Sequence, residues 1–193
     1  MSPFRMGATP VTWGIWKEYL ETIALPGKGI QLPYDPGWGY PDDHPVVNVS
    51  WNDIMDPGGF CEWASGVAGF KLTLPTDAQW EYAARGGHDG LEYPWGNDFY
   101  ESKLWCDADE TAAVDRKGSI YRNGYGLTDM VGNVWQWTGS AYRPYPGFRA
   151  ADGAVGEYNG KFMSGQFVLR GGSCATPRGH VRASYRNFFY PHQ

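Results

Sequence analysis

Three cysteines are the residues in this sequence with the greatest potential for redox or soft-metal chemistry. They are Cys61, Cys106 and Cys174, and long stretches of chain separate them. Three are too few for a disulfide framework, and an odd number predicts free thiols in a reducing compartment. We therefore expect a cytoplasmic protein in which each cysteine is a small buried thiol.

The four histidines give no metal-binding pattern. None is followed by another at the i, i+4 spacing that places two imidazoles on one face of a helix. His44 precedes Pro45, which predicts a turn residue, and we expect His88 and His192 to be exposed. The sequence predicts no iron site built from its own histidines.

Three arginines recur every four residues near the C-terminus, interleaved with aromatic and aliphatic residues. The set comprises Arg178, Arg182 and Arg186, with Val181, Tyr185, Phe188 and Phe189 between and after them. One interpretation is an anion site, because a guanidinium group pairs with a carboxylate through two parallel hydrogen bonds. The other is that the arginines lie over aromatic rings at a strand edge. The pattern alone leaves both open.

The composition limits the class of protein. With 193 residues, the chain fits one domain, 1–193, that is long enough to bury a core. Ten Trp, 13 Tyr and 9 Phe exceed what such a core needs, and 27 Gly and 14 Pro indicate a loop-rich fold. The net charge of −5 argues against nucleic acid or an anionic membrane as partner. No apolar run is long enough to span a membrane, and we expect no signal peptide.

Helix signals appear in three places. Thr12 predicts the N-cap of a helix over 13–23, with Trp13, Trp16, Leu20 and Ile23 on its apolar face. Ser50 predicts a second helix, which the segment 56–59 must interrupt before it resumes at Phe60. The spacing from Thr76 to Gln79 predicts a capping box for a third helix that ends at Gly86.

Strand signals are shorter. We predict strands over 46–49, 71–74 and 167–170. The stretch 124–138 reads as tight turns that lead into a strand at 134–137, because glycines interrupt any helical period. Trp135 and Trp137 should share one face of that strand. Asp129 and Asn133 can tie the irregular backbone together through their side chains.

Four segments in this order carry a family resemblance: 44–51, 74–87, 124–138 and 168–173. From about residue 9 onward, the set resembles the superfamily of formylglycine-generating enzymes (sulfatase-modifying factors). That superfamily also includes the lectin-like domain of ergothioneine-pathway sulfoxide synthases and some ligand-binding proteins. The resemblance implies a C-type-lectin-like α+β fold with little regular structure. Residues 139–193 look most like the sulfoxide synthases, and both ends look shorter than in relatives.

The resemblance does not extend to copper chemistry. Formylglycine-generating enzymes hold copper with two cysteines just after the Arg-Gly-Gly-Ser turn, since copper(I) requires soft thiolates. Here Cys174 follows Ser173 directly and no second cysteine comes after it. We therefore expect no formylglycine-generating activity and no cofactor in this chain.

Similarity to the sulfoxide synthases implies a substrate-binding role. Those enzymes bind iron through three histidines, mainly from a separate helical-bundle domain that this sequence does not encode. Tyr158 matches the second tyrosine of a pair near iron and oxygen, although Val155 stands at the first position. Asn187 and Phe188 match the Asn-aromatic pair of the substrate loop, and Phe189 replaces the acid that follows it.

These matches predict a small-molecule site where residues 156–163, 170–173 and 182–189 converge. Tyr158 is its catalytic candidate, and the binding candidates are Arg182, Tyr185, Arg186, Asn187 and Phe188. Calcium is a further possibility, because superfamily members bind it beside the Gly-Asn-x-Trp-Glu-Trp turn. Asn133 is kept there, but Gln136 replaces the acid, so we expect calcium to be weak or absent.

Three functions follow from this resemblance. The first is the substrate-binding lectin-like domain of a sulfoxide-synthase-type iron oxidoreductase, which is inactive without its iron-binding domain. The second is a non-catalytic ligand-binding module, like the variable proteins of diversity-generating retroelements. The third, an active formylglycine-generating enzyme, is disfavoured by the missing cysteine. The expected partners are a small polar ligand and, in an intact protein, an N-terminal iron-binding domain.

Overall fold

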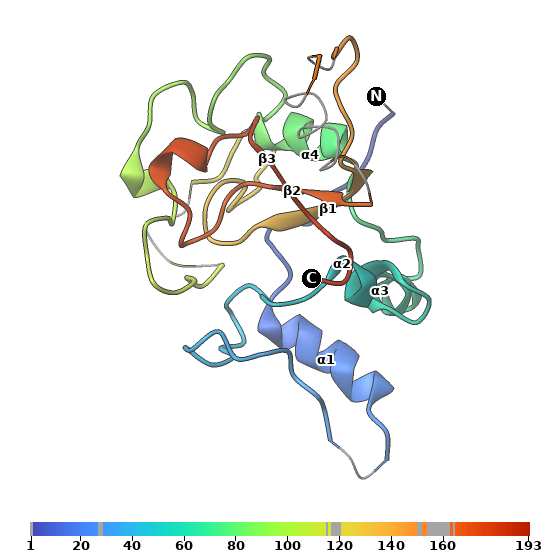
Figure 1. The fold of residues 1–193 in the computed structure, drawn as a ribbon. Helices are drawn as coiled ribbons and strands as arrows, with labels where there is room; N and C mark the ends of the chain where they lie inside the picture. Colours follow the sequence, from blue (N-terminus) through green and yellow to red (C-terminus); the bar gives the residue numbers. More distant parts are fainter. Residues whose placement is uncertain are drawn as a thin grey trace.

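The chain has an α+β fold in which loops outweigh helices and strands (Figure 1). The computed structural model describes residues 2–26, 29–114, 116, 121–149, 152–153, 163 and 165–193. Its helices are α1 (Trp13–Ile23), α2 (Trp51–Met55), α3 (Phe60–Ala68) and α4 (Asp77–Ala84). Its strands are β1 (Gln136–Ala141), β2 (Phe167–Arg170) and β3 (Arg186–Phe189). No helix of this described part is long and apolar enough to cross a membrane.

The three strands form one antiparallel sheet with β2 in the middle. Leu169 pairs with Trp137 on one side and with Asn187 on the other. In Figure 1, α4 lies above the sheet, while α1, α2 and α3 lie below it. The alternation of side chains along β2 matches this arrangement: Arg170 reaches α4, and Leu169 packs in the cluster that contains α1 and α3 residues.

Local capping explains where the helices begin. The Thr12 hydroxyl accepts a hydrogen bond from the amide of Ile15 at 3.5 Å. Ser50 and Thr76 each form a capping box, with Asp53 and Gln79 respectively. The predicted starts of α1, α2 and α4 are confirmed. Helix α4 ends at Ala84, two residues before the predicted Gly86.

The predicted break between α2 and α3 is also confirmed. Gly58 has a φ of 82°, in the left-handed region that favours glycine. A Cβ on Gly59 would lie 2.8 Å from the carbonyl oxygen of Asp56, so the chain can turn this closely only without a side chain there. The turn lets α3 start again at Phe60 in a new direction.

Two predicted strands are wrong. The segment 46–49 forms no strand: only Pro45 makes a bridge, to Thr12, and Asn48 has a φ of 58°. The segment 71–74 is extended but is held by a side chain, since the Ser65 hydroxyl binds both the amide (2.8 Å) and the carbonyl oxygen (3.2 Å) of Leu72. An apolar alternation produces a strand only where a second strand is available to pair with it.

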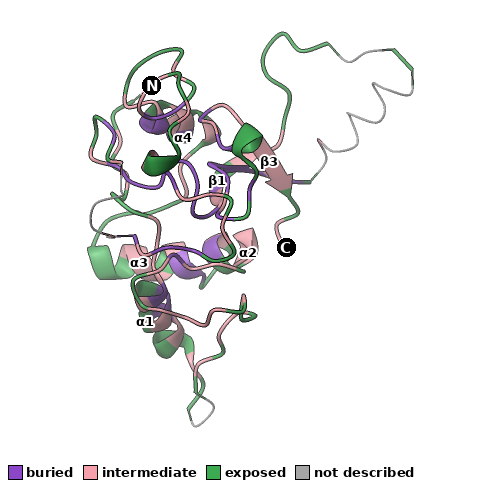
Figure 2. Cartoon of the chain, turned by 90° about the vertical axis from the view of Figure 1, so that its left-hand side faces the viewer, coloured by how far each residue is buried: buried purple, intermediate pink, exposed green. Residues whose placement is uncertain are grey.

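The core is divided between two main clusters on opposite sides of the sheet, and Figure 2 shows buried segments running between α4 and α2. The larger contains Trp13, Trp16, Tyr19, Ile54, Phe60, Trp137 and Leu169. The second contains Trp80, Ala83, Ala84, Leu127, Met130 and Ala183. On α1, Tyr19 is buried, and Ile23, predicted on the apolar face, is 52% exposed.

The two tryptophans of the central stretch share a face, as predicted. Trp137 is buried and donates a hydrogen bond from Nε1 to the carbonyl oxygen of Val49 at 3.0 Å. Trp135 is half-buried and packs against the same cluster. The strand begins later than predicted, at Gln136, because residues 131–134 form the turn that precedes it.

Candidate functional site

Asn133 ties three segments of irregular backbone together. Its side chain is fully buried and exchanges two hydrogen bonds of 2.9 Å with the backbone of Ala112. Its side-chain amide nitrogen also donates to Asp129 at 3.2 Å, and its backbone carbonyl oxygen accepts from the backbone amide of Cys174 at 2.8 Å. Asp129 and Asn133 both have positive φ, at 51° and 63°. The structural role predicted for these two side chains is confirmed.

The calcium role of Asn133 stays a prediction. Its side-chain oxygen already accepts the Ala112 amide, so a bound calcium ion would have to displace that bond. Asp129 is engaged as well, because Arg116 donates to its two carboxylate oxygens at 2.7 and 3.2 Å. Within the residues that the structure describes, no group of three or more His, Cys, Asp or Glu is arranged to hold a metal ion.

A buried ion network joins the sheet to α4. The side chain of Arg170 is 1% exposed, and its guanidinium group contacts Asp77 at 2.5 Å and Glu81 at 2.9 Å. A further bond of 3.0 Å goes to the carbonyl oxygen of Ala183. Burial opposes the charge, but the hydrogen bond and charge of Asp77, with the charges of Tyr145 and Glu81, raise the Arg170 pKa. The guanidinium therefore stays charged inside the fold.

Arg186 belongs to the same network. Its Nε lies 3.2 Å from the second carboxylate oxygen of Asp77, and Nη1 donates to the carbonyl oxygen of Arg143 at 2.9 Å. The guanidinium lies 4.8 Å and 4.5 Å from the ring centres of Tyr142 and Tyr145. The sequence pattern placed Arg170 in the turn 170–173 of the predicted site and gave it no charged partner, although Asp77 and Glu81, four residues apart on a helix, could have indicated a shared cationic partner.

The predicted binding residues fall into separate groups. Arg186 and Phe188 point to one face of β3, where the Phe188 ring stacks on Tyr142 with centres 4.3 Å apart. Asn187 points to the opposite face by strand alternation, and its side-chain oxygen accepts the amide of Phe188. Arg182 lies over the ring of Tyr185 at 5.6 Å and donates to the carbonyl oxygen of Gly179. Tyr158 lies outside the described residues.

All three arginines of the four-residue repeat lie over aromatic rings. Arg178 is 4.4 Å from the centre of Phe99, and Arg182 and Arg186 lie over Tyr185, Tyr142 and Tyr145. The contact with aromatic rings is therefore as the second interpretation predicts, but of these three arginines only Arg186 lies on a strand, β3. The anion role stays a prediction, because an arginine that rests on a ring can still present its N–H groups to a ligand.

The cysteines are free thiols, as predicted, in settings that favour the protonated form. Burial raises the pKa of Cys61, Cys106 and Cys174, and the charges of Asp107 and Glu101 add to it at Cys106. Cys174 is buried as predicted, at 6% exposed, whereas Cys61 and Cys106 are only half-buried, so the expectation of three buried thiols is wrong for these two. A thiolate is the form that attacks substrates and binds soft metals. These thiols are therefore poorly suited to either task near neutral pH.

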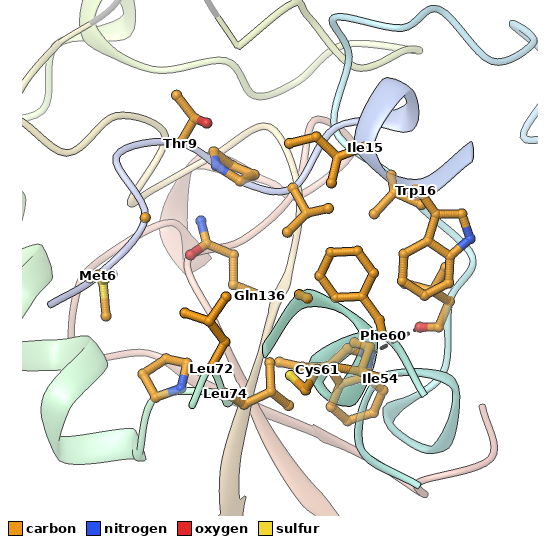
Figure 3. Close-up of a pocket in the computed structure, with 18 of the residues that line it drawn as sticks. Met6, Thr9, Ile15, Trp16, Ile54, Phe60, Cys61, Leu72, Leu74 and Gln136 are labelled. Atoms are coloured by element: carbon orange, nitrogen blue, oxygen red, sulfur yellow. Dashed lines mark hydrogen bonds between the residues drawn. The ribbon is translucent and has the colours of Figure 1, made fainter. Parts of the chain in front are cut away.

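A hollow lies elsewhere in the described part of the molecule. A cavity of about 560 Å³ lies between α1, α3, the segment 72–75 and the start of β1 (Figure 3). In that view, Met6 and Trp16 stand on opposite sides, with Phe60 and Gln136 between them. Sequence analysis missed this cavity, since its lining comes from several separate segments. The excess of aromatic residues was the one available signal.

Comparison with known families settles what kind of domain this is. The profile of the family described as sulfatase-modifying factor enzyme 1-like domain matches residues 1–193. The chain belongs to this family. Variable protein 1 of Treponema denticola has a similar fold, with a TM-score of 0.67 and 22% identity over 97% of this chain and 79% of that one. The predicted loop-rich, C-type-lectin-like α+β fold is confirmed.

Curated relatives in the sulfatase-modifying factor family differ in activity. The formylglycine-generating enzyme of Thermomonospora curvata is 35% identical over 67% of this chain and 45% of its own length. The inactive C-alpha-formylglycine-generating enzyme 2 of Mus musculus is 38% identical over 70% and 41%. The hercynine oxygenase of Mycolicibacterium smegmatis is 29% identical over 97% and 50%. The chain thus spans half or less of the length of each.

Proposed function

We propose that this chain is the substrate-binding domain of a sulfoxide-synthase-type oxidoreductase, and that it depends on a separate iron-binding domain for catalysis. The observation that carries the proposal is the extent of similarity to hercynine oxygenase. That match covers 97% of this chain but only half of the relative, as expected for one domain of a two-domain enzyme. The formylglycine-generating enzyme of T. curvata matches only 67% of the chain.

The face of β3 that carries Arg186 and Phe188 supplies the described part of such a site. The ion network there contains three guanidinium groups, from Arg85, Arg170 and Arg186, and the two carboxylates of Asp77 and Glu81. Three positive and two negative charges leave a net charge of +1. The guanidinium of Arg186 lies over the rings of Tyr142 and Tyr145, and Phe188 stacks on Tyr142. This combination suits a small polar ligand with a carboxylate.

Calorimetric titration of the purified chain with hercynine, cysteine and γ-glutamylcysteine tests the proposal. At least one of these carboxylates should bind, and Arg186→Ala should weaken that binding by about 2–3 kcal/mol, because the partner charge is partly desolvated. Arg178→Ala is the matched control, since Arg178 also lies over an aromatic ring but outside this face. Affinity is compared per folded molecule. Absence of binding to all three ligands by the parent chain contradicts the proposal.

A second candidate is a non-catalytic ligand-binding module. Two observations favour it: the single cysteine after the Arg-Gly-Gly-Ser turn, and the 38% identity to a mouse relative named as inactive. In that case the chain should bind none of the three sulfur-pathway ligands, while it keeps its fold. Formylglycine-generating activity, the third candidate, requires a reactive thiol pair, and the buried Cys174 thiol with its raised pKa offers little support for it.

A further inference from the structure

The cavity beside α1 has the size and lining of a ligand site. Its volume is about 560 Å³, within the range of roughly 300–1,000 Å³ that is typical of small-molecule pockets. Water is a poor occupant here, because a buried water needs two to four polar partners and this lining is mostly aliphatic and aromatic.

Two aromatic walls face the hollow. On one side Trp16 and Phe60 stack with ring centres 5.1 Å apart, and Trp63 packs on Phe60 at 5.5 Å. Trp135, just before β1, and Trp137 on β1 form the second aromatic part of the lining. Both walls are fixed by the larger core cluster. The cavity is therefore a preformed apolar slot.

Exposed residues of the lining mark the mouth of the cavity; they are mostly apolar, with Thr9 and Thr73 as uncharged polar residues and Glu18 as an acid. Ile15 on α1 and Val67 on α3 are 44% and 71% exposed and line the opening. Glu18 is the one charged residue of the lining, and it stands three positions after Ile15 on the same helix face. Glu18 makes no ion pair with any of the described residues, whereas its neighbour Lys17 pairs with Asp42.

From these features we propose that the cavity binds an alkylammonium ligand. The apolar chain of the ligand lies between the tryptophan walls, and its cationic head lies at the mouth beside Glu18. The carboxylate supplies charge complementarity, and the nearby rings of Trp16 and Trp63 favour a cation over an anion. This site is separate from the β3 face and does not rest on the function proposed for that face.

Tryptophan fluorescence titration of the full chain tests the proposal with three probes that each carry a ten-carbon chain: decyltrimethylammonium, decanol and decanoate. The two ionic probes are used below their micelle-forming concentrations. We expect the cation to bind about tenfold more tightly than decanoate. Glu18→Gln should remove that preference and keep the affinity for decanol. Glu21→Gln, on the same helix but outside the lining, should change neither. Equal binding of cation and anion by the parent chain would overturn the proposal.

A second experiment tests whether the ligand binds inside this cavity. Cys61 lines the cavity and Cys106 does not, so decyltrimethylammonium should slow alkylation of Cys61 by N-ethylmaleimide, read by mass spectrometry, and leave Cys106 unchanged. Ala64→Phe should fill the cavity and reduce binding of all three probes; if this variant does not fold, the alkylation result decides. Equal protection of both thiols, no protection of either, or a melting temperature lowered by the cation contradicts binding in this cavity.

Discussion

The guanidinium group of Arg170 lies inside the fold, between Asp77 and Glu81 of α4 and the carbonyl oxygen of Ala183. A buried charge is tolerated only where its partners replace the hydration it has lost. Arg170 meets that requirement with five hydrogen-bond partners from three separate segments, because the carbonyl oxygen of Tyr185 and the hydroxyl of Tyr145 also accept from it. Those segments are far apart in the sequence. The Arg-Gly-Gly-Ser pattern at 170–173 therefore predicted a turn but not the ion network of Arg170.

Substitution of Arg170 should show how much the network depends on it. Arg170→Met should lower the free energy of unfolding by about 3 kcal/mol, because Asp77 and Glu81 keep their partial burial and lose a shared counter-charge. Arg182→Met is the matched control. Among the described residues, the Arg182 side chain donates one hydrogen bond, to the carbonyl oxygen of Gly179, so its loss should lower the free energy of unfolding by less than about 1 kcal/mol. Urea unfolding measures both. Equal stability of the two variants would mean that the network contributes little.

The buried thiol of Cys174 should make stability depend on pH in the alkaline range. Burial raises its pKa in the folded chain, while the unfolded thiol titrates near its ordinary value, about 8.5. As pH rises above that value, the unfolded chain loses its proton first, so the free energy of unfolding falls. Cys174→Ala should reduce this fall between pH 8 and 10 and leave the dependence below pH 7 unchanged. An identical alkaline slope in both proteins would contradict the prediction.

At the scale of elements, the four α-helices could be predicted, whereas two of the four predicted strands do not form and β3 was not among the predicted strands. Thr12, Ser50 and Thr76 act on amides within three residues, so their sequence signals already contain the interaction. The strands depend on distant partners. The segment 71–74 has strand-like residues, but its neighbour is the hydroxyl of Ser65 and not another strand. The cavity was hidden for the same reason, since its walls come from five separate segments.

The cap of α4 supports the network as well as the helix. Thr76 accepts the amide of Gln79 at 3.2 Å, and Gln79 accepts the amide of Thr76 at 2.8 Å, one residue before Asp77. Thr76→Ala should lower the free energy of unfolding by about 1 kcal/mol. Thr76→Ser keeps the hydroxyl and should lie within about 0.5 kcal/mol of the parent chain. Chemical denaturation compares them, and equal losses in both variants would assign the effect to the lost methyl group.

For the molecule as a whole, four motifs in the right order were enough to predict the family and the fold. The positions of the cationic network and of the apolar cavity could not be predicted from these motifs. A cationic network lies on the α4 side of the sheet, and an apolar cavity lies on the side of α1 and α3. The two faces differ in polarity, so one domain can present two chemically different sites.

The metal content of the purified chain tests the expectation that the whole molecule has no copper or iron site of its own. We expect the purified chain to hold neither copper nor iron near one ion per molecule after exposure to either metal. Copper(I) requires two thiolates that reach one ion, and the thiol after the Arg-Gly-Gly-Ser turn is single, buried and raised in pKa. Iron requires clustered imidazoles or carboxylates, and the described residues form no such cluster. Elemental analysis of parent, Cys174→Ser and Cys61→Ser chains decides the matter. A content near one copper per chain that is lost only in Cys174→Ser would contradict this expectation. It would then favour the copper-dependent formylglycine-generating enzyme over the other two candidates.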